Sequence, residues 1–295
     1  MSLKLAIEKY ITENRRKVNL SIGENLPSAN DRVSRAMRYA VFNGGKRLRP
    51  VLFIAVFESL GGRIDSGILT IASAIEFIHT FSLIQDDLPA LDNDDYRRGK
   101  PAAHKVFGED IAILASDSLL NAAYKILLEE DAIAAGLKVK IASELMRTVK
   151  ILISGQEGDL ALTPRKPAGL LRLKEIYSGK TAALIAACAK IAGILRAVKA
   201  GELRRLNSFG MKLGLSYQIL DDILNVTAEN KAFKGRKFSD QRKGKITYVS
   251  LIGLKKSQEI VENLMRQAKR ELAKIDKIDK GTLFLLADFI LQRRY

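Results

Sequence analysis

Residues 66–85 read SGILTIASAIEFIHTFSLIQ, and this stretch decides the fold class. Its apolar side chains fall on nearly every side of a helical wheel, and they do not alternate with polar residues at a period of two. A helix that is apolar all round is expected at the centre of a bundle, where other helices cover every face. The stretch therefore predicts a buried central helix in an all-α protein.

Helical periodicity also dominates the rest of the chain. Besides 66–85, the expected helices cover residues 3–17, 30–42, 51–60, 111–128, 137–154, 171–197, 202–226, 246–273 and 282–291. The chain has no long linker rich in Ser, Gly or Pro, and it contains only 6 prolines. We therefore expect a single domain over residues 1–295, folded as a bundle of about ten or more helices.

The chain is strongly basic, with 49 Lys and Arg residues against 33 Asp and Glu residues and a formal net charge of +16. Such an excess indicates an anionic partner, which could be a nucleic acid, a membrane surface or a phosphorylated substrate. Aromatic residues make up only 6% of the chain and tryptophan is absent, so a row of base-stacking side chains is not expected. We therefore expect no nucleic-acid partner.

Cysteine content and hydropathy indicate the compartment. Cys188 is the only cysteine, which excludes an internal disulfide and suits a reducing environment. The N-terminal segment is charged and lacks the apolar region of a signal peptide, and Lys190 interrupts the best candidate for a long apolar run. We expect a cytoplasmic protein without a membrane span.

An acidic cluster follows directly on the apolar stretch, since residues 86–95 read DDLPALDNDD. Carboxylates at the end of a buried helix are costly unless something neutralises them, and they also oppose the helix dipole. Pro89 must disturb the helix because it has no amide donor. That break can bring Asp92 beside Asp86, whereas a straight helix would hold them roughly 240° apart. A solvated acidic helix end is the plainer alternative.

A second acidic cluster, DDILN at residues 221–225, lies inside the expected helix 202–226 among apolar neighbours. Asp221 and Asn225 are four residues apart and share a helix face. Adjacent aspartates in a buried helix are rare unless they are paired or bind a metal. Together the two clusters predict facing walls of one metal cavity, and oxygen ligands without a matching His or Cys set favour Mg²⁺.

Cationic residues provide the complement to phosphate groups, which complete the coordination shell of magnesium in many sites. GGKRLRP at residues 44–50 places Lys46, Arg47 and Arg49 beside a glycine turn, and RR at residues 97–98 follows the first acidic cluster. Arginine presents a planar fork that suits phosphate oxygens. Two plainer interpretations stay open. Residues 46–49 could form an ordinary basic turn, and Arg97 and Arg98 could form ion pairs with Asp94 and Asp95.

These motifs resemble those of the trans-isoprenyl diphosphate synthases, most closely the bacterial farnesyl diphosphate synthases. The matching blocks occur in family order and span most of the chain. They are GGKRLRP (44–50), EFIHTFSLIQDDLPALDNDDYRRGKPAAH (76–104), GEDIAILASDSLL (108–120), SGQEGDL (154–160), GKTAALI (179–185), YQILDDILNVT (217–227) and SDQRKGKITY (239–248). The resemblance implies the isoprenoid synthase fold around a deep central cavity, a homodimer, and condensation of isopentenyl diphosphate with an allylic diphosphate such as dimethylallyl or geranyl diphosphate.

The resemblance also implies roles for individual residues. The implied metal ligands are Asp86 and Asp92 for two magnesium ions and Asp221 for a third, with Asp87 and Asp222 in the same motifs. The implied isopentenyl diphosphate pocket consists of Lys46, Arg49, His79 and Arg98. The allylic diphosphate is implied to bind Arg97, Lys180 and Lys245, and the expected catalytic set is Lys180, Thr181 and Gln218. Taken by itself, His79 is more simply a core histidine.

Phe81 bears on the length of the product. It lies five residues, or about one and a half turns, before Asp86 on the helix that is expected to line the pocket. An aromatic side chain there resembles the farnesyl-producing members of the family, whereas smaller side chains accompany longer products. Farnesyl diphosphate is the expected product, with geranyl and geranylgeranyl diphosphate as alternatives. A plain core residue is the other interpretation of Phe81.

Three positions depart from the family pattern. Asn225 replaces the last aspartate of the second motif, Gln85 stands where a histidine is usual, and Gly235 aligns with a common lysine. Asparagine can still accept a hydrogen bond from a metal-bound water, so weaker metal binding is expected rather than lost activity. The other candidate functions are a class I terpene cyclase, a low-activity regulatory subunit of a prenyl synthase and, on charge alone, a nucleic-acid-binding module.

Overall fold

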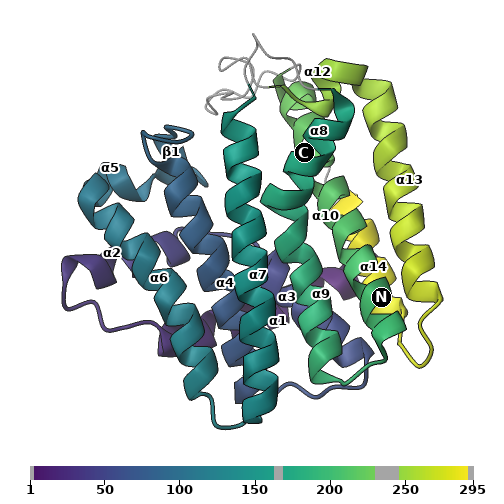
Figure 1. Cartoon of the computed structure of the whole chain (residues 1–295), viewed down its shortest axis with the longest axis horizontal. Coiled ribbons are helices and arrows are strands. Elements are labelled where there is room, and N and C mark those ends of the chain that lie inside the picture. Colours follow the sequence, from purple (N-terminus) through teal and green to yellow (C-terminus); the bar gives the residue numbers. More distant parts are fainter. Residues whose placement is uncertain (1–2, 163–168, 230–245, 292–295) are drawn as a thin grey trace. The chain divides into compact units, whose positions relative to one another are not determined.

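The structure is a computed structural model that describes residues 3–162, 169–229 and 246–291 (Figure 1). Contacts divide the chain into two compact units, Met1–Met146 and Arg147–Tyr295, and each unit is described by itself. Apart from one short hairpin, the described residues form helices and connecting turns, which confirms the all-α prediction. The expectation of a single domain stays a prediction.

The first unit is built around one apolar helix, α4 (Ser66–Asp87), as the sequence predicts. Its other elements are α1 (Leu3–Asn25), α2 (Arg32–Phe42), α3 (Leu48–Ser59), β1 (Tyr96–Arg97), β2 (Lys100–Pro101), α5 (Ala103–Phe107), α6 (Glu109–Glu129) and the start of α7 (Ala135–Leu160). Helices α1, α3 and α6 pack against α4, so most of its side chains are buried.

Local sequence sets both ends of α4. Asp65 caps the N-terminus, because its carboxylate accepts a hydrogen bond of 2.9 Å from the amide of Ile68. Apolar residues then follow without a polar face, and Ile71, Ile75 and Phe77 are fully buried. Burying one such side chain stabilises the fold by roughly 1.5–3 kcal/mol. The helix ends one residue before Leu88, just ahead of the proline that the sequence identifies as a helix breaker.

A hairpin that the sequence analysis did not predict follows the first acidic cluster. Strands β1 and β2 pair antiparallel, and the two turn residues Arg98 and Gly99 have positive φ angles of 54° and 81°. Two-residue turns of this kind require positive φ at both central positions, which glycine adopts without strain. The strands have two residues each, which is too short for a period-two pattern to reveal them.

The second unit is built around α10 (Ala200–Glu229), which packs against the neighbouring helices α9 and α13 (Figure 1). Its elements also include the last part of α7, α8 (Leu170–Tyr177), η1 (Ser178–Ala182), α9 (Ala183–Leu195), α12 (Tyr248–Ile252), α13 (Leu254–Ala273) and α14 (Gly281–Leu291). Buried apolar residues of α8, α10, α12 and α13 pack together into one core cluster of this unit.

Two expected helices are interrupted in the structure. The expected helix 171–197 contains one π-helical turn, η1, between α8 and α9. The expected helix 246–273 is divided at Gly253, whose φ of 81° lies in a region that a regular helix does not use. A single wide turn does not change the apolar periodicity enough to be recognised from sequence, because the flanking helices keep the same 3.6-residue pattern.

Three helical segments are long and apolar enough to cross a membrane, judged by length and composition alone. They are Ser66–Asp87, Glu109–Glu129 and Leu170–Leu195, and their most apolar windows are 78%, 39% and 72% buried. Most of the apolar surface of the first and third segments is therefore buried by packing within the protein. The absence of a membrane span stays a prediction.

Candidate functional site

The end of α4 folds the first acidic cluster back on itself. Beyond Pro89, the amide of Asp92 donates a hydrogen bond of 2.9 Å to the carbonyl of Asp86, and the amide of Asp94 donates one of 3.2 Å to the carbonyl of Asp87. These bonds bring position 92 beside position 86, as the helix break predicts. Both Asp86 and Asp92 are half-buried at this turn.

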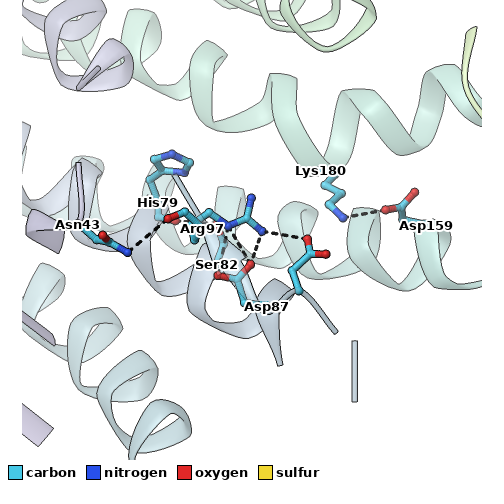
Figure 2. A network of polar contacts seen from close by, with 8 residues as sticks. Asn43, His79, Ser82, Asp87, Arg97, Asp159 and Lys180 are labelled. Carbon is cyan, nitrogen blue, oxygen red and sulfur yellow. Dashed lines mark hydrogen bonds and ion pairs between the residues drawn. The ribbon is translucent and has the colours of Figure 1, made fainter. Parts of the chain in front are cut away.

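The carboxylate of Asp87 is buried and pairs with the guanidinium of Arg97 (Figure 2). The Nε atom of Arg97 donates to both carboxylate oxygens of Asp87, at 2.8 and 3.2 Å, and its Nη2 atom also contacts Oδ1. Asp94 lies 3.5 Å from the same guanidinium. Burial raises the pKa of Asp87, and the ion pair with Arg97 opposes that rise.

The contact of Arg97 with Asp94 matches one of the plainer interpretations that the sequence leaves open, whereas the closer ion pair of Arg97 with Asp87 was not predicted. Asn43 adds a further tie, since its side-chain amide donates a hydrogen bond of 3.4 Å to the carbonyl of Arg97. Arg97 is therefore held from two sides in the first unit. Its role toward a diphosphate, like the role of Asp87 toward a metal, stays a prediction.

The remaining carboxylates fit magnesium by their chemistry. Among the described residues, no group of three or more His, Cys, Asp and Glu side chains is close enough to enclose a metal ion. Magnesium does not need such a cage, because it is commonly held through one or two carboxylates, with water and substrate phosphates completing the shell. Asp86 and Asp92, brought together by the turn, are an oxygen-only pair of this kind.

Two of the four residues expected in the isopentenyl diphosphate pocket contact each other directly, and a third contacts the glycine turn beside Lys46. The Nη1 atom of Arg49 lies 3.0 Å from Nε2 of His79, and Arg98 donates through Nη1 to the carbonyl of Gly44, two residues before Lys46. Burial and the nearby arginines lower the pKa of His79 well below its usual value. His79 is therefore neutral at pH 7 and accepts from Arg49.

Arg49 keeps donor capacity in this arrangement. Its Nε atom is buried and has no hydrogen-bond partner within residues 3–162, 169–229 and 246–291. Arg49 also lies in the first turn of α3, where backbone N–H groups create a positive end. A buried cationic donor beside a helix N-terminus is a favourable place for an anion.

Glycine at position 45 makes room for Arg98. A Cβ atom at Gly45 would lie 2.6 and 2.7 Å from Nη1 and Cζ of the Arg98 guanidinium, which is closer than real side chains approach. Gly45 also has a φ of 122°, which other residues rarely adopt. The positive φ angles of Gly44 and Gly45, 95° and 122°, explain the glycine pair of the sequence motif, and at Gly45 the missing side chain also leaves room for the guanidinium of Arg98.

Arg47 does not behave as the sequence analysis expects. The motif was interpreted as three cations beside a flexible turn, but Arg47 is 4% exposed and its guanidinium points into the first unit. It pairs there with Glu76 at 2.8 Å. Arg47 is therefore not available to an anion at this turn, because a buried ion pair satisfies its charge.

In the second unit, the two adjacent aspartates of α10 differ in burial as Asp86 and Asp87 do: the second is buried and the first is half-buried. Asp222 is 3% exposed, and its Oδ2 atom accepts hydrogen bonds from the hydroxyl of Tyr177, at 2.9 Å, and from the amide of Tyr248, at 3.2 Å. Asp221 is half-buried and Asn225 is exposed. Asp222 therefore ties α8 and α12 to α10, which leaves Asp221 as the better candidate ligand.

We expect Tyr177→Phe to lower the stability of the protein without changing the position of Asp221. Removing one hydrogen bond from a buried carboxylate costs about 1–3 kcal/mol, while the phenyl ring keeps the packing of the apolar cluster. Thermal unfolding should shift downward by a few degrees. Tyr124→Phe, which alters a half-buried tyrosine in α6, is the matched control. An unchanged midpoint for the first variant would contradict the proposed tie.

The π-helical turn η1 carries Lys180 and Thr181, two of the three expected catalytic residues, and α10 carries the third, Gln218. Lys180 donates a hydrogen bond of 2.7 Å to Asp159 of α7 (Figure 2), and Thr181 donates one of 2.8 Å to the side-chain oxygen of Gln218 in α10. π-helical turns occur often at functional sites, because the extra residue changes the direction of the side chains that follow. Thr181 and Gln218 thus contact each other directly, while Lys180, the residue before Thr181, pairs with Asp159 of α7.

The remaining expected residues have simpler surroundings. Phe81 is 4% exposed in α4, and its carbonyl accepts a hydrogen bond of 3.3 Å from Ser116 of α6. Lys245 and Gly235 lie outside the described residues. Gln85 is half-buried in the last turn of α4.

Sequence reasoning missed several residues that shape these contacts. Tyr177 and Glu76 carry no motif signal of their own, because their partners lie far away in the sequence. His104, which has no role in the sequence analysis, is 7% exposed and close enough to Asp87 to lower its pKa. Buried polar residues inside apolar helices were the available signal, since such groups are rarely left without partners.

Comparisons with known proteins agree with this arrangement. A sequence model of the polyprenyl synthetase family matches residues 30–280. The large subunit 1 of a heterodimeric geranylgeranyl pyrophosphate synthase from Arabidopsis thaliana is 39% identical over 97% of this chain and 79% of its own length.

Solved structures extend the similarity to the whole fold. An FPP/GFPP synthase from Zymomonas mobilis has 30% identity and a TM-score of 0.83, and the match covers 96% of this chain and 97% of that one. A geranyltransferase from Legionella pneumophila has 28% identity and a TM-score of 0.86, covering 99% and 98% of the two chains.

Proposed function

Because the chain belongs to the polyprenyl synthetase family and is a short-chain prenyltransferase, we propose that it condenses isopentenyl diphosphate with an allylic diphosphate to give mainly farnesyl diphosphate. The observation that supports the two-substrate reaction is the presence of two sets of cations. One set, Lys46, Arg49 and Arg98, lies around the start of α3, and the other consists of Arg97, which pairs with Asp87, and Lys180, which pairs with Asp159.

Each cation set has a distinct task in this reaction. Lys46, Arg49 and the neutral His79 bind and orient isopentenyl diphosphate, whose double bond is the nucleophile. Arg97 and Lys180 hold the allylic diphosphate and stabilise the charge that develops as its carbon–oxygen bond breaks. Asp86, Asp92 and Asp221 would hold magnesium, which would supply further charge neutralisation for the departing diphosphate.

The allylic carbocation needs weak, oriented oxygen atoms and the exclusion of water. Thr181 and Gln218 are hydrogen-bonded to each other, which fixes the direction of both side-chain oxygens. Fixed dipoles of this kind stabilise a developing cation without capturing it, whereas water would quench it. After the new carbon–carbon bond forms, the proton that is lost leaves to the released diphosphate.

Product length is the finer part of the proposal. Phe81 is buried on α4 and supports a stop at the farnesyl length, as an aromatic side chain at this position does in farnesyl-producing members. A second candidate, geranylgeranyl diphosphate, is favoured by relatives with 37–39% identity that are named as geranylgeranyl synthases. The two candidates differ in whether Phe81 limits the growing chain.

Phe81→Ala is expected to lengthen the main product by about one isoprene unit. Phe77 lies four residues earlier on the same face of α4, about 6 Å along the helix, and it is fully buried. It becomes the next barrier once the ring of Phe81 is removed. Chromatography of the dephosphorylated products measures the change, and Phe81→Leu is a milder variant in case the cavity destabilises the fold.

Phe53→Leu, a buried aromatic of α3, is the matched control for loss of a core ring. It should lower stability while leaving the product distribution unchanged. An identical distribution from wild type and both Phe81 variants would remove Phe81 as the stop. Geranylgeranyl diphosphate as the main product of the wild type would favour the second candidate.

The reaction itself is tested with purified chain, labelled isopentenyl diphosphate and either dimethylallyl or geranyl diphosphate, with and without Mg²⁺. We expect condensation only in the presence of the metal. Incubation with farnesyl diphosphate alone separates the terpene cyclase, because a cyclase consumes that substrate without isopentenyl diphosphate. A chain that is inactive alone but active with a second subunit would indicate the heteromeric arrangement named for the Arabidopsis relative.

We also propose a homodimer in the cytoplasm. Large apolar side chains are exposed along α5 and α6, with Val106, Ile113, Leu114 and Leu128 between 45% and 51% exposed. Such residues gain stability when a partner covers them. Light scattering of the purified chain at several concentrations tests this state, and a monomer throughout would contradict it.

A further inference from the structure

Arg47 is anchored inside the first unit by four hydrogen-bond acceptors. Its guanidinium contacts Asn19 Oδ1 at 2.9 Å, Glu76 Oε1 at 2.8 Å, and the carbonyls of Val41 and Gly44 at 2.7 and 3.3 Å. The side chains of Arg47 and Glu76 are only 3% and 1% exposed. Four of the five N–H groups of Arg47 therefore donate to acceptors within the protein, and burial keeps this side chain away from a substrate.

The backbone at Arg47 is held in an unusual conformation. Its φ and ψ angles are 50° and 37°, in the left-handed region that residues other than glycine seldom adopt. This conformation persists only where surrounding contacts enforce it. Arg47 is also the residue immediately before α3, so its backbone sets the direction in which that helix begins.

The left-handed backbone at Arg47 points its side chain to a different side from the side chains of Lys46 and Arg49. Lys46 is exposed and Arg49 is half-buried, whereas the side chain between them points into the unit. Two contacts then join the start of α3 to α4: Arg47 with Glu76, and Arg49 with His79. Glu76 and His79 are three residues apart, so these contacts lie about one helical turn apart on neighbouring positions of α4.

We propose that the buried Arg47–Glu76 pair is a positioning device for the isopentenyl diphosphate pocket, acting through Lys46, Arg49 and His79. This inference rests on the proposed function of those three residues. Arg47 and Glu76 do not touch the substrate. They hold the left-handed turn, and the turn places the substrate-binding cations at the distance that the diphosphate requires.

Removing one member of the pair should weaken binding of isopentenyl diphosphate more than it lowers the rate of the chemical step. Glu76→Gln keeps the shape of the side chain and one acceptor oxygen but removes the charge that holds the guanidinium. We expect KM for isopentenyl diphosphate to rise about tenfold, because small displacements of binding groups have large effects on substrate affinity. KM for the allylic diphosphate should stay within about twofold of the wild-type value.

A double variant, Arg47→Met with Glu76→Leu, separates positioning from stability. Replacing both members of a buried ion pair with apolar residues of similar volume is often neutral for stability, whereas removing one leaves an uncompensated charge. The double variant should therefore unfold close to the wild-type temperature, yet its KM for isopentenyl diphosphate should remain raised at least about tenfold. Calorimetric titration with isopentenyl diphosphate gives a second measurement that does not depend on turnover.

Glu58→Gln is the matched control. Glu58 lies near the far end of α3 and accepts a hydrogen bond of 2.5 Å from Tyr10, so the variant disturbs the same helix away from the turn. It should lower the unfolding temperature without raising KM for isopentenyl diphosphate. If the pair is only a stabilising element, Glu76→Gln should behave like Glu58→Gln, and the double variant should bind the substrate normally.

That last result would overturn the positioning role and leave the proposed function standing. Failure of the wild-type protein to bind isopentenyl diphosphate would instead overturn the proposed function, and the inference would fall with it. A raised KM that persists in the stable double variant supports the inference directly.

Discussion

Asp86→Ala is expected to lower kcat about a thousandfold while the protein keeps its fold. Asp86 is half-buried at the turn after α4, and the bond to Asp92 that shapes this turn uses the carbonyl of residue 86 and not its side chain. The backbone arrangement therefore survives the substitution. Loss of a group that stabilises developing charge typically lowers the rate by about 10²–10³, and loss of a bound metal adds to this effect.

Asp95→Asn is the matched control for Asp86→Ala. Asp95 belongs to the same acidic cluster, but its carboxylate pairs with Lys105 at 3.3 Å and is 44% exposed. The control should retain activity within about threefold, since exposed ion pairs contribute little. Turnover by Asp86→Ala at more than a tenth of the wild-type rate, at saturating Mg²⁺, would remove Asp86 from the metal-binding set. Chelation of the wild type should abolish condensation, and added Mg²⁺ should restore it.

Gly155→Ala is expected to have the largest effect among changes that leave every charged group in place. A Cβ atom on Gly155 of α7 would contact the backbone nitrogen of Lys180 and lie 2.7 Å from the carbonyl carbon of Gly179. Backbone atoms cannot rotate away, so α7 and η1 must separate. Overpacking of this kind costs typically 1–3 kcal/mol. The separation also disturbs the ion pair of Lys180 with Asp159, so kcat should fall about ten- to a hundredfold.

Gly136→Ala, in the same helix, is the matched control for this contact. A Cβ atom at Gly136 meets nothing within 4 Å, so the substitution should stabilise α7 by about 0.5–1 kcal/mol. Opposite shifts of the unfolding temperature for the two variants are the expected result. A stable and fully active Gly155→Ala protein would show that the close approach of α7 to η1 is not needed for function.

The sequence predicts the fold class well because its strongest signal is physical. A helix that is apolar on every side must be covered by other helices, and α4 spans Ser66–Asp87, two residues beyond the expected stretch. The break at Pro89 and the return of Asp92 to Asp86 follow from the missing amide of proline. Local rules of this kind need no knowledge of distant residues.

Tertiary partners explain what the sequence could not predict. The inward direction of Arg47 depends on Glu76 and on a left-handed backbone angle, neither of which has a local signature. The pairing of Asp87 with Arg97 was not predicted, because the sequence suggested only Asp94 and Asp95 as partners for the two arginines. The meeting of the two acidic clusters in one cavity stays a prediction, because they belong to different units of the chain.

The division of labour within each aspartate pair has a genetic consequence. Asp87 and Asp222 are buried and pair with Arg97 and Tyr177, whereas Asp86 and Asp221 are half-buried and are the proposed metal ligands. Substitutions of adjacent residues should therefore produce two different phenotypes. Loss of Asp86 or Asp221 yields abundant but inert protein, while loss of Asp87 or Asp222 yields scarce protein that low growth temperature or a stabilising second-site suppressor restores.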